Sequence, residues 1–489
     1  MLEVIGPGAD VLTIDAAGAS RVLRVAAGAD ASLSGLTITG GQVDGPGGGV
    51  LNESAALALC DVTIVGNAAS NHGGGVCNSG GDLSLLNVRI AGNLVDADAV
   101  SWGGGLYNDG TLTITGGTVS GNHITGGRAL GGGILNEGLL TLTGASVSDN
   151  SSEGSAGGIG NHGTMTLLAA TVSGNSAASY CGGVANQFGT AVLINTVVTG
   201  NAAAFDGGGV RAVRGTLTLT HVTVAGNAAG GSGGGIDTSD QSTVVINNSI
   251  VAMNSAEFDP DVRGAVAGSH TLIGIDPGFV DPAAGDYRLK PASIAINVGD
   301  GALAVDAGGA PLTTDGDGLP RVADAAVDVG AFEYQGPPDP GREDPSLRVT
   351  TLQDAVDAAD GQTSLREALA WAMFDPDPST VTFLPHLAAG TIALTGGQLW
   401  LTGAIAIEGP AGGLTLDADG DVDLDDFALL KWNFGAGAAV PAAAGAVDLL
   451  TATAVEPLRP HPLRRGPRRA RADAATPSVF DVLAARPLL

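Results

Sequence analysis

Apolar and polar residues alternate over short stretches of this chain, as in Leu140-Thr141-Leu142-Thr143. A period of two residues is typical of a β-strand with one buried face and one face in solvent. Between Gly47 and Asn254 such stretches are bounded by Gly and Asn residues, and helical spacing is absent. The pattern therefore predicts short strands joined by turns over this whole region.

The same unit recurs eight times in this region, with a period of roughly 26 residues. The apolar residue after each glycine run falls at Val50, Val76, Leu106, Ile134, Ile159, Val184, Val210 and Ile236. A self-similar period of this length is typical of a solenoid whose coils stack about 4.8 Å apart. We predict an all-β fold, a parallel β-helix with coils of about 25–30 residues and three short strands in each coil.

Two asparagine columns follow the same period. One closes the units at Asn67, Asn93, Asn122, Asn150, Asn175, Asn201, Asn227 and Asn254. The other comprises Asn52, Asn78, Asn108, Asn136, Asn161 and Asn186 and is interrupted at Ala212 and Thr238. Stacked Asn side chains pass amide hydrogen bonds from coil to coil, and Gly permits positive φ at the corners. We interpret both columns as structural.

The net charge, the number of cysteines and the length of the apolar runs exclude several classes of protein. The 489 residues include 50 acidic and 21 basic side chains, for a formal net charge of −29, which argues against a nucleic-acid-binding surface. Cys60, Cys77 and Cys181 are odd in number and predict no disulfide framework. No run of 18 apolar residues predicts a membrane span, and the opening residues lack the pattern of a signal peptide.

One stretch of the sequence occurs twice. Residues 6–18, from Gly6-Pro7 to Ala17-Gly18, reappear one residue shorter as residues 409–420. Residues 347–408, which precede the second copy, look like the natural beginning of such a module. We therefore expect that Met1 lies inside a module, that an export signal lies upstream of it, and that the protein is extracellular or on the cell surface.

The region after the solenoid, which we assign to residues 1–270, resembles a known family. Residues 276–282, Asp-Pro-Gly-Phe-Val-Asp-Pro, and 327–334, Val-Asp-Val-Gly-Ala-Phe-Glu-Tyr, are similar to the closing segment of bacterial choice-of-anchor β-helix proteins, which are exported surface proteins. The resemblance implies a right-handed β-helix closed by coils over residues 271–334. A Pro- and Gly-rich linker at 335–346 follows.

Residues 347–416 resemble an amino-terminal cap and the start of a second, truncated β-helix module. Thr363-Ser364-Leu365-Arg366-Glu367-Ala368 is similar to the CSLREA motif at the amino-terminal edge of such proteins, with Thr363 in place of Cys. Ser364 and Glu367 have the spacing of a helix capping box. We predict a short helix here, with Arg366 and Glu367 as a solvated ion pair.

An acidic stretch follows within residues 415–435. With Gly420 at position 6 of an EF-hand-type loop, the calcium ligands would be Asp417, Asp419, Asp421 (through its carbonyl), Asp423 and Asp426. Thr415 at position 1 departs from the motif, so we expect weak binding, roughly 0.1 to 1 mM. The stretch resembles a single dockerin repeat, which implies a cohesin-like protein as a partner. Residues 436–489 predict a basic, disordered tail.

Two classes of function are compatible with these features. Parallel β-helices include pectate lyases and polygalacturonases, and the best catalytic constellation is Asp206, Arg211, Arg214, His221 and Asp237, where the second Asn column is interrupted. An arrangement of Asp206, Arg211 and Asp237 around one groove would favour a polysaccharide lyase or glycoside hydrolase. Outward rows of Thr, Ser and Asn without convergent carboxylates would favour a non-catalytic scaffold for adhesion or for contact with polysaccharide or another cell-surface component, which is the function that we expect.

Overall fold

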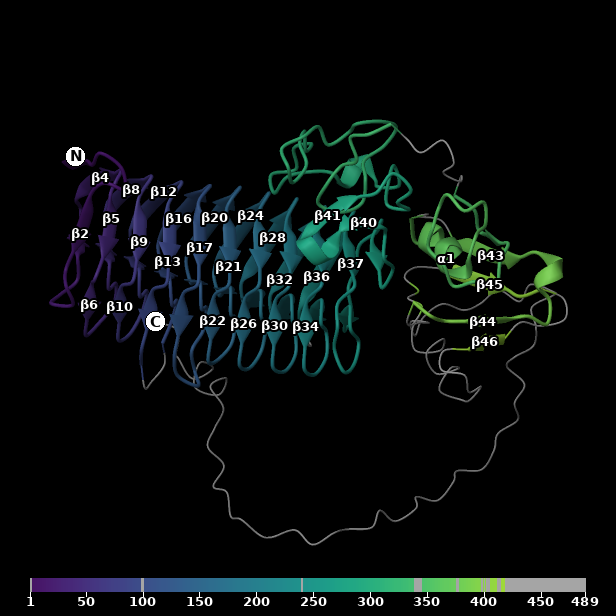
Figure 1. Cartoon of the computed structure of the whole chain (residues 1–489), viewed down its shortest axis with the longest axis horizontal. Coiled ribbons are helices and arrows are strands. Elements are labelled where there is room, and N and C mark those ends of the chain that lie inside the picture. Colours follow the sequence, from purple (N-terminus) through teal and green to yellow (C-terminus); the bar gives the residue numbers. More distant parts are fainter. Residues whose placement is uncertain are drawn as a thin grey trace, which may run out of the picture. The chain divides into compact units, whose positions relative to one another are not determined.

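A computed structural model describes residues 2–97, 101–238, 241–337, 345–374, 378–396, 399, 401, 405–410 and the backbone of 415–417. Most of its strands form four long parallel sheets that run along the solenoid (Figure 1). Each interior coil adds one strand to every sheet, so the predicted right-handed parallel β-helix is confirmed. The prediction of three strands per coil is wrong, because a fourth strand of two residues is too short to show alternation in the sequence.

The sheets, named A to D, have the following strands. Sheet A contains β1 (Leu2–Ile5), β4 (Asp30–Ser34), β8 (Ala56–Cys60), β12 (Asp82–Leu86), β16 (Thr111–Thr115), β20 (Leu139–Thr143), β24 (Thr164–Leu168), β28 (Thr190–Ile194), β32 (Thr216–Thr220) and β36 (Thr243–Asn247). Sheet B contains β2 (Thr13–Asp15), β5 (Thr37–Thr39), β9 (Thr63–Val65), β13 (Arg89–Ala91), β17 (Thr118–Ser120), β21 (Ser146–Ser148), β25 (Thr171–Ser173), β29 (Val197–Thr199), β33 (Thr223–Ala225), β37 (Ile250–Ala252) and β39 (Leu272–Ile273).

The other two sheets complete each coil. Sheet C contains β3 (Leu23–Val25), β7 (Val50–Glu53), β11 (Val76–Ser79), β15 (Leu106–Asn108), β19 (Ile134–Asn136), β23 (Ile159–Asn161), β27 (Val184–Gln187), β31 (Val210–Val213), β35 (Ile236–Thr238) and β38 (Val262–Arg263). Sheet D contains β6 (Gln42–Val43), β10 (Ala68–Ala69), β14 (Leu94–Val95), β18 (His123–Ile124), β22 (Ser151–Ser152), β26 (Ser176–Ala177), β30 (Ala202–Ala203) and β34 (Ala228–Ala229).

The core of the solenoid consists of columns of apolar side chains. The eight residues of the column from Val50 to Ile236 are all 0% exposed, as the sequence pattern predicts. In β20, Leu140 and Leu142 point into the core while Thr141 and Thr143 are only partly buried. No coil encloses its own core, so the stacking of identical positions supplies the burial that stabilises the fold.

Both asparagine columns form hydrogen-bonded ladders inside the solenoid. In the column that starts at Asn67, a main-chain N–H and an Nδ2 both donate to Oδ1 of the next Asn, as from Asn122 to Asn150 at 3.0 and 2.9 Å. In the column that starts at Asn52, only Nδ2 donates to the next Oδ1, as from Asn108 to Asn136 at 2.7 Å. The structural interpretation of both columns is confirmed.

The glycine runs serve two different purposes. The first residue of a run lies at positive φ, for example 76° at Gly131, a conformation that favours glycine. The third residue faces the next coil and the Asn67 ladder: a Cβ on Gly133 would lie 2.8 Å from the main-chain oxygen of Gly158 and 2.9 Å from Nδ2 of Asn150. Lack of space for a side chain, rather than backbone conformation, therefore requires glycine at this third position.

The segment after β39 differs from the predicted closing coils. It contains the antiparallel pair β40 (Phe279–Asp281) and β41 (Asp286–Leu289), with short 3-10 helices at Pro282–Ala284 and Gly301–Leu303. It folds back over the outer face of sheet B, where Ala331 N–H donates to Oγ1 of Thr223 at 3.0 Å. The outward row of sheet B there includes the apolar residues Val197 and Ile250 on either side of Thr223, which explains where the segment packs.

The region from 345 onwards holds smaller elements. Strands β42 (Arg348–Val349), β43 (Ser379–Phe383) and β45 (Ile405–Glu408) form one parallel sheet, and β44 (Thr391–Ala393) pairs in parallel with β46 (Thr415–Asp417). Helix α1 (Leu365–Phe374) follows Ser364, and a 3-10 helix covers Pro385–Leu387. The predicted capping box is confirmed, because Ser364 N–H donates to Glu367 at 2.8 Å and Glu367 N–H donates to Ser364 Oγ at 3.1 Å.

The prediction that Arg366 and Glu367 form a solvated ion pair is wrong. Arg366 is 3% exposed and binds Asp354 at 2.7 Å. Glu367 is 1% exposed and accepts main-chain N–H groups from Ser364 and Asp357. The two side chains have different partners because all ten residues of α1 are buried, so this helix has no solvated face.

Candidate functional site

Three of the predicted catalytic residues meet at the end of sheet C. Arg211 in β31 pairs in register with Asp237 in β35, and Asp237 pairs with Arg263 in β38. Arg211 Nε lies 2.7 Å from Oδ2 of Asp237, and Arg263 lies 3.4 Å from its Oδ1. Asp206, in the turn before β31, binds Arg263 at 2.9 Å. We call Asp206, Arg211, Asp237 and Arg263 the charged column.

The charged column is internally compensated. It holds two carboxylates and two guanidinium groups, and each carboxylate contacts at least one arginine. Asp237 is 0% exposed, and burial raises its pKa although Arg211 and Arg263 oppose the shift. The second oxygen of Asp206 accepts the N–H of Ser232 at 2.9 Å. The ion pairs hold these side chains in place. They also engage both carboxylates, which would otherwise be the candidates for acid–base chemistry.

Arg214 and His221 lie away from the charged column. Arg214 stands 5.9 Å above the ring of Phe188. His221 is fully buried, 3.1 Å from Nδ2 of Asn248, and burial, together with the charge of Arg321, lowers its pKa. The structure therefore assembles Asp206, Arg211 and Asp237 from the predicted constellation and separates the other two.

Arg263 is the member of the charged column that was not predicted from the sequence. It lies one coil after Asp237 in sheet C, just as Asp237 lies one coil after Arg211. Arg263 could therefore have been predicted from the sequence as the residue one coil period after Asp237. Beside this column, the Arg211 guanidinium stacks 4.2 Å from the ring of Tyr180, which is 37% exposed.

A second polar and aromatic group lies nearer the amino terminus and was not predicted. His72 stacks against both Trp102 and Tyr107, with ring centroids 4.7 and 5.0 Å away, and the rings of Trp102 and Tyr107 lie 6.0 Å apart. Tyr107 donates its hydroxyl to Glu137 at 2.6 Å, and Glu137 lies 3.7 Å from His162. The contact with His162 helps to lower the pKa of Glu137. These contacts engage the Tyr107 hydroxyl and the Glu137 carboxylate, whereas Nδ1 of His72 is buried without a hydrogen-bond partner.

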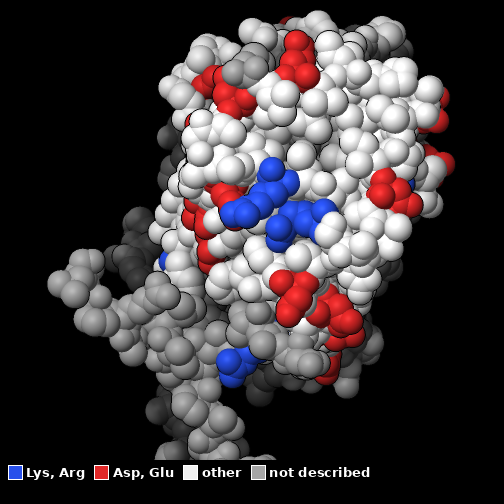
Figure 2. All heavy atoms as spheres, turned by 90° about the vertical axis from the view of Figure 1, so that its left-hand side faces the viewer, with Lys and Arg blue, Asp and Glu red and all other residues white. Residues whose placement is uncertain are grey.

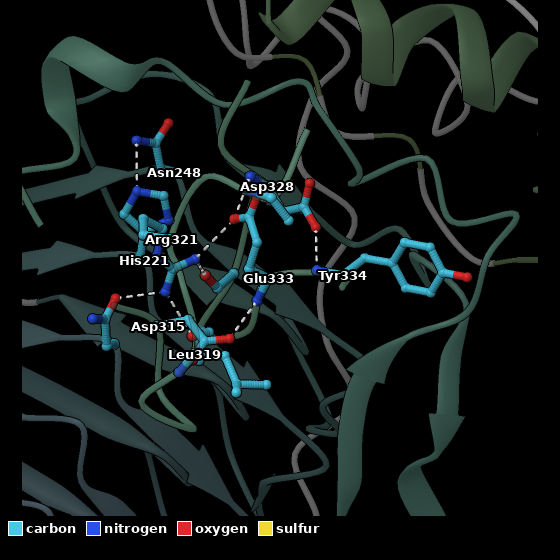
Figure 3. Close-up of polar contacts among 12 residues, drawn as sticks. His221, Asn248, Asp315, Leu319, Arg321, Asp328, Glu333 and Tyr334 are labelled. Atoms are coloured by element: carbon cyan, nitrogen blue, oxygen red, sulfur yellow. Dashed lines mark hydrogen bonds and ion pairs between the residues drawn. The ribbon is translucent and has the colours of Figure 1, made fainter. Parts of the chain in front are cut away.

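A buried network of polar and charged side chains lies in the closing segment (Figure 3). Arg321 is 0% exposed and donates to Oδ1 of Asn195 at 2.6 Å and to the carbonyl of Ala331 at 2.7 Å. It lies 3.6 Å from Glu333, whose pKa burial raises to about 8. Because Asn195 belongs to the solenoid, this network fastens the closing segment to the coils and is structural.

The predicted calcium ligands lie almost entirely outside the described residues. Only the backbone of Thr415–Asp417 is described, as strand β46. A strand therefore occupies the first positions of the loop, whereas a helix–loop–helix site would have a helix end there. Among the residues that the structure describes, no three His, Cys, Asp or Glu side chains are grouped so that they could hold a metal ion.

The outer face of sheet A carries a regular row of exposed residues, most of which are threonine. The register of the strands aligns Thr111, Leu139, Thr164, Thr190, Thr216 and Thr243. All six side chains are exposed. A second row beside it includes Thr113, Thr141, Thr166 and Thr218. Both rows correspond to the outward pattern that we expect for a scaffold.

Comparison with known proteins gives no match to a family model, to a curated protein or to a solved structure. In the described part of the chain, no helix is long and apolar enough to cross a membrane. The function must therefore be inferred from the surface of the solenoid itself.

Proposed function

We propose that this protein is a non-catalytic, exported scaffold that contacts polysaccharide through the outer face of sheet A. The observation that supports the proposal is the exposed row from Thr111 to Thr243, in which five of six residues are threonine. Adhesion to a carbohydrate-bearing cell surface would use the same contact.

The spacing of these side chains suits an extended polymer. Equivalent positions on neighbouring strands lie about 4.8 Å apart, and alternate residues along a strand about 6.6 Å apart. Each threonine offers a hydroxyl that both donates and accepts hydrogen bonds, beside a methyl group. The two rows therefore form a rigid grid of polar and apolar groups, and rigidity lowers the entropic cost of binding a repeating ligand.

Binding to insoluble polysaccharides such as cellulose, chitin and xylan tests this proposal. We expect the double variant Thr164→Lys, Thr216→Lys to bind at least about 10-fold more weakly, a loss of about 1.4 kcal/mol. The matched control is Thr118→Lys, Thr171→Lys, which adds the same charge to the outer face of sheet B. Equal losses in both variants, or no binding by the unmodified chain, would overturn the proposal.

A polysaccharide lyase or glycoside hydrolase is the second candidate, because Asp206, Arg211 and Asp237 do converge. Their mutual ion pairs argue for a structural role instead. We expect no unsaturated product from polygalacturonate and no reducing ends from neutral polysaccharides, with or without calcium. Product formation that Arg211→Ala abolishes while the protein stays folded would establish the enzyme.

Calcium binding by the stretch from Asp417 to Asp426 belongs to the same proposal. Six closely spaced aspartates repel one another unless a cation neutralises them. Calorimetric titration should give binding at roughly 0.1 to 1 mM, which the double variant Asp419→Ala, Asp423→Ala removes. An unchanged titration in that variant would eliminate the loop as the site. A cohesin-like partner would require this calcium-bound form.

A further inference from the structure

The aromatic residues of the solenoid gather beside one of its four long sheets. Among residues 1–270, Phe, Trp and Tyr occur at six positions: Trp102, Tyr107, Tyr180, Phe188, Phe205 and Phe258. Tyr107 belongs to β15 of sheet C, and the other five lie in turns that precede or follow strands of that sheet. Among the described residues, the apolar cluster inside the coils consists of Ala, Val, Ile, Leu and Met side chains. The core of the solenoid therefore does not explain why these rings are present.

Four of the rings are exposed to solvent. Tyr180, Phe188, Phe205 and Phe258 have exposed fractions of 37%, 47%, 52% and 61%. Phe188 follows β27, whereas the other three precede strands of sheet C. A group of exposed apolar side chains on one side of a protein marks a surface that contacts another molecule. We call Tyr180, Phe205 and Phe258 the aromatic border.

The aromatic border follows the axis of the solenoid. The ring of Tyr180 lies 5.4 Å from the ring of Phe205. Main-chain N–H groups link the turns that follow, from Gly231 to the carbonyl of Phe205 and from Phe258 to that of Gly231, both at 3.0 Å. Phe258 is therefore two coils beyond Phe205, or about 10 Å along the axis. Gly231, at the position between them, contributes no side chain.

The charged column lies next to the aromatic border, on the outer face of sheet C. Arg211 joins the two, because its guanidinium stacks 4.2 Å from the ring of Tyr180 while its Nε contacts Asp237. The side chains of Arg263 and Asp206 are 39% and 21% exposed, so a ligand on this face can reach their outer atoms. The two features together form a strip of apolar rings beside a row of hydrogen-bonding groups.

The charges of the protein favour an uncharged ligand for this strip. The two carboxylates of the charged column compensate its two guanidinium groups, so the column has no excess positive charge for a polyanion. The whole chain carries a formal net charge of −29. On the end of the solenoid that Figure 2 shows, Asp and Glu are spread widely, whereas Lys and Arg gather mainly in one central group. A polyanion would therefore be repelled.

We propose that the aromatic border and the charged column bind a single chain of a neutral polysaccharide that lies along the solenoid axis. One face of a pyranose ring presents C–H groups, which pack against aromatic rings. The hydroxyl groups at its rim form hydrogen bonds with charged side chains. The interval of two coils between Phe205 and Phe258 is comparable to the length of two sugar units in an extended chain. Apolar rings beside a few fixed polar groups are typical of ligand sites.

This contact is separate from the one on sheet A and shares with the proposed function only its class of ligand. Sheet A offers a wide grid of side chains to the surface of an insoluble polymer, whereas the aromatic border receives one soluble chain. Soluble oligosaccharides therefore test the aromatic border, and insoluble polysaccharides test sheet A. Either contact can fail while the other stands.

Calorimetric titration of the full-length chain with cellohexaose, xylohexaose and N-acetylchitohexaose tests the proposal. We expect at least one of them to bind with a dissociation constant below about 1 mM. The double variant Phe205→Ser, Phe258→Ser should bind that sugar at least about 10-fold more weakly, because aromatic anchors supply much of the binding energy of such surfaces.

The matched control is Leu319→Ser, Val322→Ser, which removes two apolar side chains that are 45% and 55% exposed in the closing segment. It should bind like the unmodified protein, and circular dichroism confirms that each variant folds. No binding of the three sugars at about 1 mM, or equal affinity in the double variant and the control, would overturn the proposal. Hexagalacturonate, a polyanion, should bind more weakly than the neutral sugars, and equally tight binding would overturn the neutral class.

A second copy of the chain is the alternative occupant of the aromatic border. It would appear in sedimentation velocity as self-association of the unmodified protein that Phe205→Ser, Phe258→Ser abolishes. That result would overturn the assignment of the aromatic border to polysaccharide. We expect the unmodified protein and the double variant to sediment alike.

Discussion

The two asparagine ladders look alike in the sequence but differ in what they hold in place. In the Asn67 ladder, Oδ1 of Asn150 accepts both the main-chain N–H and the Nδ2 of Asn122. In the Asn52 ladder, Oδ1 of Asn136 accepts only the Nδ2 of Asn108. Only the first ladder therefore satisfies a buried main-chain donor in each coil, although Nδ2 also donates to a main-chain carbonyl in both ladders.

This difference explains why one column is unbroken and the other is not. A buried main-chain N–H without a partner is costly, so the Asn67 ladder has no tolerated gap. The Asn52 ladder stops at Asn186, where Nδ2 keeps only the two carbonyl contacts, to Gly189 and Thr216 at 3.0 Å. Ala212 can follow it in register because no main-chain donor depends on the missing amide.

Substitution in the middle of each ladder should give the largest effect. Asn150→Ala removes the acceptor for two N–H groups of Asn122 and the donor to Val119 O, and we expect a loss of about 3–5 kcal/mol in unfolding free energy. Asn136→Ala should cost about 2–3 kcal/mol, since Asn108 Nδ2 keeps its bond to Gly110 O. Denaturant unfolding measures both.

The two variants are controls for each other, since the residue change is the same and both sites are 0% exposed. Equal losses would show that the main-chain N–H contributes nothing beyond the side-chain links. A larger loss of unfolding free energy for Asn136→Ala than for Asn150→Ala would mean that the Asn52 ladder contributes more to stability than the Asn67 ladder.

At the end of the Asn67 ladder, we expect one substitution to raise the free energy of unfolding rather than lower it. Asp261 accepts the main-chain N–H of Asn254 at 3.2 Å and its Nδ2 at 2.9 Å. Burial raises the pKa of the Asp261 carboxyl to about 6, against an ordinary value near 3.9. The folded state therefore binds more protons than the unfolded state between about pH 4 and 6, and its stability falls as pH rises through that window.

Asp261→Asn should keep the ladder and remove the charge. We expect a gain of about 1–3 kcal/mol at pH 7 and no gain below about pH 4, where the native carboxyl is protonated. Urea titrations at pH 4, 5, 6 and 7 test this difference. A gain that is constant with pH would exclude the carboxylate as its cause.

The sequence predicted the parts of this fold that recur once per coil. Residues such as Val50 and Asn67 repeat at a fixed position, so the period alone assigns their environment. Strands of two residues, such as Ala68–Ala69, lack enough length to show alternation and were missed. The fold-back of the closing segment was also missed, because it depends on apolar residues on the outer face of sheet B, including Val197, that local alternation cannot explain.

As with the fold, the sequence predicted part of the candidate site. Asp206, Arg211 and Asp237 were found because they lie where the Asn52 column is interrupted. His221 was wrongly grouped with Arg211 and Asp237. Residues one coil period apart lie in the same column, but residues at different positions within one coil, such as Arg211 and His221, point in different directions. Asp261 was missed because it occupies the third glycine position of its coil, where an acidic residue has no precedent in the repeat.

The smallest effect is expected at the first residue of the Asn52 ladder. Oδ1 of Asn52 is buried and has no hydrogen-bond partner, because Val25 precedes it in register. Asn52→Ala would remove two donor contacts, to Ala55 O and Asn78 Oδ1, but also this unsatisfied oxygen. The two terms oppose each other, so we expect a loss below about 1 kcal/mol. A loss as large as that of Asn136→Ala would show that Oδ1 of Asn52 is satisfied in solution.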